Sequence, residues 1–163
     1  MQKERAMTPR MTDHFKRIGQ AFQGLVTFET ELRKGPLEPA LLHLVKMRAS
    51  QINGCAFCLQ IHASEALKDG ETHLRLHMLA GWQDSSLFSP RERAALAWTE
   101  AVTLIDQSHT PDADWEALRA EFSEDEAAYL TFAIAAINLW NRTQIAFRVA
   151  HAAELPAERA RVA

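Results

Sequence analysis

The chain has 163 residues, 47% of them hydrophobic, which fits one compact domain and is too apolar for a disordered chain. Its formal net charge is −3 and its Lys and Arg residues are scattered, whereas nucleic-acid surfaces carry a clustered positive patch. We therefore expect a single domain over residues 1–163, with a short flexible N-terminus and C-terminal tail and no nucleic-acid partner.

The sequence also argues against a membrane or secreted protein. The charged N-terminus from Met1 to Arg5 is followed by no apolar stretch, so we expect no secretory signal and a cytoplasmic location. The longest apolar run, from Ala127 to Trp140, is shorter than the roughly 20 residues that a bilayer needs. We expect no membrane partner.

Helical periodicity runs along the whole chain and alternating strand patterns are absent, which predicts an all-α fold of about six to seven helices. A first helical region is expected from about Asp13 to Arg33, with a break near Gly19, and Gly35-Pro36 ends it. A second helix runs from Pro39 to about Gln51, and Gly54 marks the next break.

Further helices follow from capping signals. One begins near Cys55 and stops at Gly70, and Thr72 caps a short helix through about Ala80. Ser89-Pro90-Arg91-Glu92 is a capping box whose helix carries an apolar stripe: Ala94, Ala97, Trp98, Ala101, Val102 and Ile105. Thr110-Pro111 opens another short helix.

A second capping box, Ser123-Glu124-Asp125-Glu126, starts the longest helix, which we expect to reach about Ala150. This helix is apolar nearly all round: Leu130, Phe132, Ala133, Ile134, Ala136, Ile137 and Leu139. Such a helix must be covered on every side, so we infer that part of it or its neighbours meets another subunit. The alternative is that it is simply the central core helix.

The segment from Ile52 to His62 holds both cysteines of the protein, three residues apart, with a histidine four residues beyond the second. Cys55, Cys58 and His62 therefore form one stripe down a helix. Cys55 stands near the helix N-terminus, where the macrodipole favours a thiolate. His62 can act as a base for Cys58, and Glu65 either orients the imidazole or is a solvated surface residue.

Two neighbouring thiols and a histidine support a two-step redox cycle. One thiolate attacks a hydroperoxide and becomes a sulfenic acid, and the other cysteine condenses with it to a disulfide. An external dithiol then reduces the disulfide. We therefore name Cys55, Cys58 and His62 as catalytic candidates, with a hydroperoxide and a dithiol as partners and with no cofactor and no metal.

Other functions of the cysteine pair stay open. The pair can serve a thiol-disulfide oxidoreductase or redox sensor with little peroxidase activity. Cys55 and Cys58 followed by His73 and His77 fit the loose spacing of a zinc-stabilised structural domain. Two buried cysteines can also act as small hydrophobic residues. Haem attachment is excluded because Leu59, not histidine, follows the second cysteine.

Two blocks of sequence, residues 41–58 with His62 and residues 135–142, resemble the AhpD-like alkylhydroperoxidase family of the carboxymuconolactone decarboxylase superfamily. The likeness covers roughly residues 12–150. It implies a compact helical AhpD-like domain that forms homo-oligomers, often trimers or hexamers, through helical faces. It also implies that Cys58 is the peroxidatic cysteine and Cys55 the resolving one, whereas the helix dipole alone makes Cys55 the more acidic thiol.

The sequence departs from the family at two positions. Members of the family carry a relay glutamate twelve residues before the first cysteine, where this chain has His43, and a histidine where it has Phe57. His43 is a further catalytic candidate as a relay base, because imidazole carries protons near neutral pH, or it fills the position for packing. Asn138, Trp140 and Arg142 either line the site or serve packing.

Overall fold

The computed structural model describes residues 8–151, so our expectations for the flexible N-terminus, including Met1 to Arg5, and for the C-terminal tail fall outside the described residues. The all-α fold is confirmed, and the described part contains no strand. Its helices are α1 (His14–Ile18), α2 (Gln20–Arg33), α3 (Pro39–Asn53), α4 (Ala56–Lys68), α5 (His73–Met78), the 3-10 helix η1 (Leu79–Asp84), α6 (Pro90–Thr103), α7 (Ile105–Ser108), α8 (Asp112–Glu121) and α9 (Glu124–Phe147). The described chain has more helices than expected, because the first region is split and short turns follow α5 and α6.

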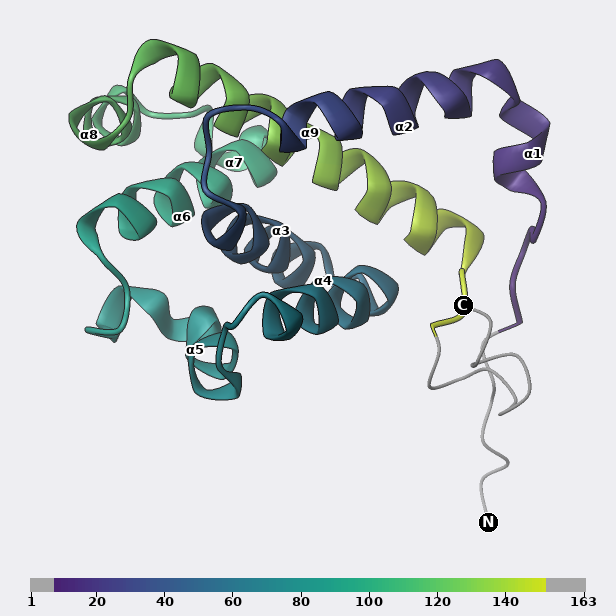
Figure 1. Cartoon of the computed structure of the whole chain (residues 1–163), viewed down its shortest axis with the longest axis horizontal. Helices are drawn as coiled ribbons and strands as arrows, with labels where there is room; N and C mark the ends of the chain where they lie inside the picture. The colour runs from purple at the N-terminus through teal and green to yellow at the C-terminus, as the bar shows by residue number, and fades with distance from the viewer. Residues whose placement is uncertain (1–7, 152–163) are drawn as a thin grey trace.

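Helix α3 lies at the centre of the fold and packs against α4, α6 and α9 (Figure 1). One hydrophobic cluster joins α3 to α6, α8 and α9, and its fully buried side chains include Val45, Leu118 and Leu130. A second cluster joins α3 to α4, α5, η1 and α6 around Leu44 and Leu79. The two clusters hold α3 in place between Leu41 and Met47, and the last turn of the helix leads into the cysteines.

Most helix boundaries agree with the sequence signals. Gly19 separates α1 from α2 with a φ of 45°, a left-handed conformation that only glycine adopts without strain. The capping boxes of Ser89 and Ser123 form both of their expected hydrogen bonds. The stripe on α6 is buried or partly buried up to Val102. Ile105 is exposed instead, because α6 ends at Thr103 and Ile105 starts α7.

Helix α9 ends at Phe147, three residues before the expected end, and Arg148 follows in the left-handed conformation. It buries one side against the core, as Leu130 and Ile134 show, but leaves Phe132 58% and Leu139 37% exposed. Within the described residues this chain therefore covers α9 on only part of its circumference. Contact with another subunit stays a prediction.

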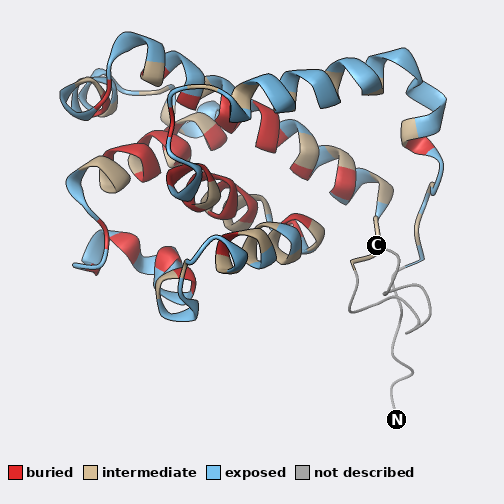
Figure 2. Ribbon diagram, viewed as in Figure 1, coloured by how far each residue is buried: buried red, intermediate tan, exposed pale blue. Residues whose placement is uncertain are grey.

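Helix α2 runs across α9 and contributes no buried residue, and Figure 2 shows it exposed along nearly all its length. Isolated contacts hold it in place: the ring of Phe28 meets that of Phe132, and the ring of Phe22 meets that of Trp140. Helix α2 thus lies across α9 as a thinly packed outer layer. None of the helices in the described range is both long and apolar enough to cross a bilayer.

Candidate active site

The turn between α3 and α4 places the two cysteines. Gly54 ends α3 with a φ of 69°, and Cys55 follows as the N-cap of α4. Its sulfur accepts a hydrogen bond from the backbone N–H of Cys58 at 3.4 Å, the contact that a Ser or Asp oxygen makes at other helix starts. The expected break at Gly54 and the helix start at Cys55 are both confirmed.

The two sulfur atoms lie 2.6 Å apart, and both cysteines are free and almost fully buried between α3, α4 and α9. A hydrogen bond from the Cys58 thiol lowers the pKa of Cys55 to about 7, against the opposing effect of burial. The same hydrogen bond, burial and the negative charge on Cys55 raise the pKa of Cys58 far above its usual range. When the pair loses one proton, the negative charge therefore lies on Cys55, as the helix-dipole argument expects.

A buried polar network fixes α9 against the cysteine turn. The amide of Asn53 donates to the side-chain oxygens of both Asn138 and Asn141 at 2.9 Å. Asn141 in turn donates to Ser50 and also hydrogen-bonds the sulfurs, which lowers the pKa of both thiols. An amide so placed at zero exposure stabilises a thiolate without contributing charge.

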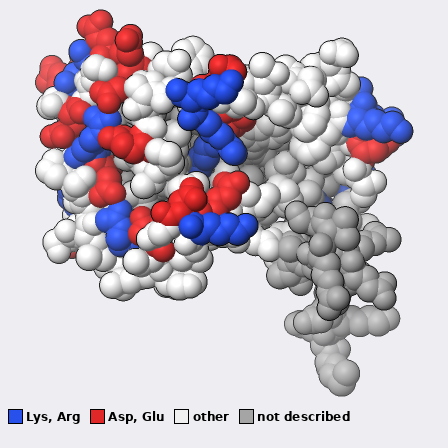
Figure 3. Space-filling view, viewed as in Figure 1, with Lys and Arg blue, Asp and Glu red and all other residues white. Residues whose placement is uncertain are grey.

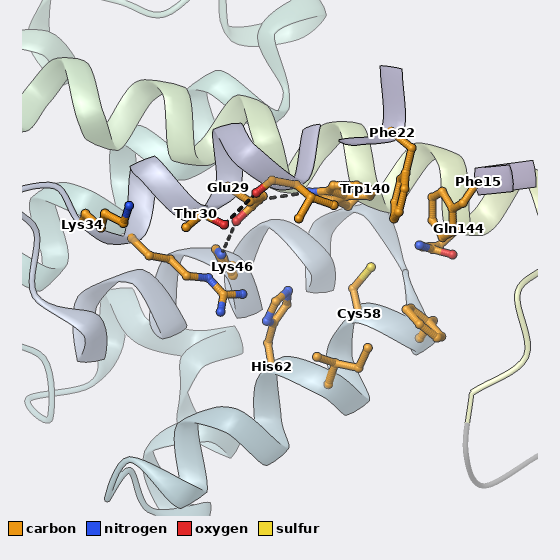
Figure 4. Close-up of a pocket in the computed structure, with 14 residues that line it drawn as sticks. Phe15, Phe22, Glu29, Thr30, Lys34, Lys46, Cys58, His62, Trp140 and Gln144 are labelled. Atoms are coloured by element: carbon orange, nitrogen blue, oxygen red, sulfur yellow. Dashed lines mark hydrogen bonds and ion pairs between the residues drawn. The ribbon is translucent and has the colours of Figure 1, made fainter. Parts of the chain in front are cut away.

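Cys58 and His62 line one cavity of about 620 Å³ beneath α2. Figure 4 shows the imidazole and the Cys58 sulfur side by side on α4, both directed into the cavity. Trp140 lies opposite Cys58, and Phe22 stands at the same end. The volume falls in the range of small-molecule sites, so the cavity has room for an organic molecule beside Cys58.

Glu65 contacts the imidazole of His62 through the ring nitrogen Nδ1. His62 Nδ1 and Glu65 Oε2 are 2.9 Å apart, one turn apart on α4. The hydrogen bond and the charge of His62 lower the pKa of Glu65 to about 2. Of the two interpretations given for Glu65, the structure shows the one in which it orients the imidazole, and within residues 8–151 no hydrogen bond engages Nε2.

Helix α2 reaches the cavity through Glu29. The two oxygens of this carboxylate accept hydrogen bonds from Lys46 and from the Trp140 indole, each at 3.0 Å. Glu29 thereby joins α2 to α3 and α9 above the cavity, and Figure 4 shows both bonds. The ion pair with Lys46 is largely buried, so removing either partner would leave an uncompensated charge.

Cys55 faces a different and smaller cavity. That cavity measures about 120 Å³ and lies between the cysteine turn and the end of α9. Gln144 lines both cavities, and its Oε1 has no hydrogen-bond partner within residues 8–151. The two sulfurs of one pair therefore approach the surface by different routes.

His43 lies on α3 beside a neighbouring cavity of about 290 Å³, together with Lys46 and Glu65. Its Nε2 is 2.7 Å from a carboxylate oxygen of Asp69. No hydrogen bond among the described residues joins His43 to His62 or to either cysteine. The structure thus brings together three of the four candidate residues, and the relay role of His43 stays a prediction.

The remaining candidate residues lie in different environments in the fold. Trp140 lines the cavity, whereas Asn138 is buried in the polar network and Arg142 donates to it from the surface. Within residues 8–151 no cluster of three or more His, Cys, Asp or Glu side chains has the arrangement of a metal site. His73 and His77 are therefore not gathered around the cysteines there.

Sequence reasoning missed Glu29, Lys46, Asn141 and the aromatic residues of α1 and α2. An asparagine inside an apolar helix was a usable signal for Asn141, because a buried amide must find partners. Glu29 and Lys46 carried no such signal, since charged residues on amphipathic helices are usually solvated. Only the crossing of α2 over α9 brings Glu29 to the site.

A family model described as the carboxymuconolactone decarboxylase family matches residues 19–101. The uncharacterised protein YdfG of Bacillus subtilis is 37% identical over 122 residues, which is 75% of this chain and 83% of YdfG. The crystal structure of ATU0492 from Agrobacterium tumefaciens, a protein of unknown function suggested to be an antioxidant defence protein AhpD, is similar with a TM-score of 0.84. It is 39% identical and covers 88% of this chain and 98% of its own. The debrominase Bmp8 shares the fold with a TM-score of 0.74 at 18% identity, over 86% of this chain and 75% of Bmp8.

Proposed function

Since the chain belongs to the carboxymuconolactone decarboxylase family, among its AhpD-like members, we propose that it is a thiol-dependent peroxidase. Its substrate would be a hydroperoxide and its reductant an external dithiol. The observation that carries the proposal is the shared cavity of Cys58 and His62, with a second thiol 2.6 Å from the first. The proposal treats the chain as a single domain that acts as a homo-oligomer without a cofactor.

In the first step the Cys58 thiolate attacks the terminal oxygen of the hydroperoxide. The O–O bond breaks, the sulfur is oxidised to a sulfenic acid, and the alcohol leaves after taking a proton from His62. Glu65 holds the imidazole for this transfer through its bond to Nδ1. Removing such a proton donor typically costs about 10²- to 10⁴-fold in rate.

In the second step the Cys55 thiolate attacks the sulfenic sulfur of Cys58. The S–S bond forms, the S–O bond breaks, and the hydroxide leaves as water after protonation. The separation of the sulfurs means that this step needs little movement of α4. The external dithiol then attacks the disulfide, leaves as its own disulfide and restores both thiols.

The division of roles between the two cysteines rests on access rather than on acidity. Cys55 is the more acidic thiol in the resting pair, but Cys58 is the one that lines the large cavity with His62. A proton passing from Cys58 to Cys55 over 2.6 Å moves the charge to the accessible sulfur. We therefore assign the peroxide step to Cys58 and the resolving step to Cys55.

The experiment is hydroperoxide consumption with dithiothreitol as the dithiol, using cumene hydroperoxide as the probe. We expect the Cys58→Ser variant to lose turnover. The Cys55→Ser variant should react once, slowly, and stop, because burial raises the pKa of Cys58 and Cys55 is no longer there to take its proton. A sulfenic acid trapped by dimedone should appear on Cys58 in the second variant. Consumption by the Cys55→Ser, Cys58→Ser double variant at the parent rate would disprove the assignment.

The second candidate is a thiol-disulfide oxidoreductase or redox sensor, favoured by the burial of both sulfurs. Such a protein would form a reversible Cys55–Cys58 disulfide but react slowly with peroxide. Stopped-flow oxidation separates the two functions, because a sensor exchanges with an oxidised dithiol much faster than with cumene hydroperoxide.

A further inference from the structure

The cavity beneath α2 is polarised along its length. Figure 4 shows Phe15 and Phe22 toward one end and Lys34 at the other, with His62, Cys58 and Trp140 between them. The aromatic end is formed by side chains from α1 and α2, whose rings meet Trp140 of α9 edge to face. An elongated molecule bound here would place an apolar part and a polar part on opposite sides of the reactive sulfur.

The polar end carries excess positive charge, although the protein as a whole has a net charge of −3. Arg33, Lys34 and Lys46 line the cavity, against the single carboxylate of Glu29. Figure 3 shows Lys and Arg side chains gathered beside a hollow near the end of α2. A cavity of this kind attracts an anion.

Two of these three cations are already neutralised. Lys46 pairs with Glu29 at 3.0 Å and Lys34 with Glu31 at 2.7 Å. Arg33 makes no ion pair with any residue in the part of the chain that the structure describes. It acts on Glu65 only through its charge, and that carboxylate is hydrogen-bonded to His62. Arg33 is thus the cation of this cavity that has a free guanidinium.

We propose that the substrate is a hydroperoxide that carries a carboxylate, and that Arg33 binds this carboxylate. The apolar body of the substrate lies against Phe22 and Trp140, and its peroxide group lies at Cys58. This inference rests on the proposed peroxidase function and specifies its substrate class. A guanidinium fork matches a carboxylate with two parallel hydrogen bonds, and one free cation suits one negative charge.

The test compares two probes that differ by one charge, linoleic acid hydroperoxide and its methyl ester, with dithiothreitol as reductant. Both carry the peroxide between an apolar tail and the carboxyl end. Since Arg33 is exposed, we expect the parent to prefer the carboxylated probe by about fivefold in kcat/KM, the value of a solvent-exposed ion pair. The Arg33→Gln variant should lose this preference, and Arg33→Glu should reverse it. The readout is the ratio of the two kcat/KM values within each variant, because any effect of the substitution on Glu65 and His62 is common to both probes and cancels in the ratio.

The matched control is Arg17→Gln, which removes an exposed arginine from α1 that pairs with Asp13 and does not line the cavity. It should keep the preference of the parent. Equal use of both probes by the parent, or an Arg33→Gln variant that keeps the preference, would overturn the inference while leaving the peroxidase intact.

A binding measurement separates the two proposals. Calorimetry with linoleate, which has no peroxide to reduce, should show about fivefold weaker binding to Arg33→Gln than to the parent. A parent that binds this carboxylate through Arg33 but consumes neither probe would disprove the peroxidase and keep the anion site. Equal binding by parent and variant would disprove the role of Arg33, whatever the activity.

Discussion

The acidity of Cys55 comes chiefly from one hydrogen bond. The Cys58 thiol, 2.6 Å away, holds the pKa of Cys55 at about 7 instead of its ordinary 9.0. A difference of this size corresponds to about 2–3 kcal/mol of preference for the thiolate, which is the strength of a hydrogen bond to a charged group. Replacing Cys58 by Ala removes the donor, so the pKa of Cys55 should rise to about its ordinary value.

The assay is the rate of iodoacetamide alkylation against pH, which follows the thiolate fraction. In Cys58→Ala the midpoint should move from about 7 to near 9, and a smaller rise should follow Asn141→Leu, which removes a weaker hydrogen bond. In Cys55→Ala, burial keeps the pKa of Cys58 raised, so alkylation at neutral pH should be slow. A midpoint that stays near 7 in Cys58→Ala would refute the reasoning and assign the acidity to the helix N-terminus.

Two further predictions concern the frame of the site. Gly54→Ala should lower the free energy of unfolding by about 1 kcal/mol, because its φ of 69° is strained for any side chain although no atom obstructs the new Cβ. Gly24→Ala, inside α2 with equally free space, should instead raise stability in the same urea titration, and equal effects at both sites would contradict the argument. Glu65→Gln should lower kcat about tenfold with an unchanged KM, because the imidazole of His62 loses its orienting partner. The folded-state pKa of Glu65, about 2, lies below its ordinary 4.5, so the parent has stability above pH 4.5 that is lost as the pH falls toward 2. The Gln variant should lack this loss, and identical acid titrations of parent and variant would argue against the pair.

The helices could be predicted from signals that act over a few residues. Gly19, Gly54 and the capping boxes at Ser89 and Ser123 each act within a few residues, so their effects could be read without knowing the fold. The errors lie at helix ends whose positions depend on contacts with other helices. The stripe of α6 was extended to Ile105 because periodicity does not reveal where Leu104 leaves the helical conformation.

The site likewise has a part that could be predicted from the sequence and a part that could not. Cys55, Cys58, His62 and Glu65 lie on one helix, and their spacing alone places them on a common face. The sequence also indicated that the start of α4 favours a thiolate at Cys55. It could not tell that Cys58 would donate to Cys55, because that depends on rotamers and on burial beneath α9.

The sequence by itself thus determined an all-helical chain with a reactive cysteine pair beside a histidine, since helix periodicity and capping are properties of short segments. Only the tertiary structure decided what surrounds the pair. Glu29 and Arg33 of α2, Lys46 of α3 and Trp140 of α9 meet around one cavity because these helices pack across one another. Their distances in space bear no fixed relation to their separation along the chain.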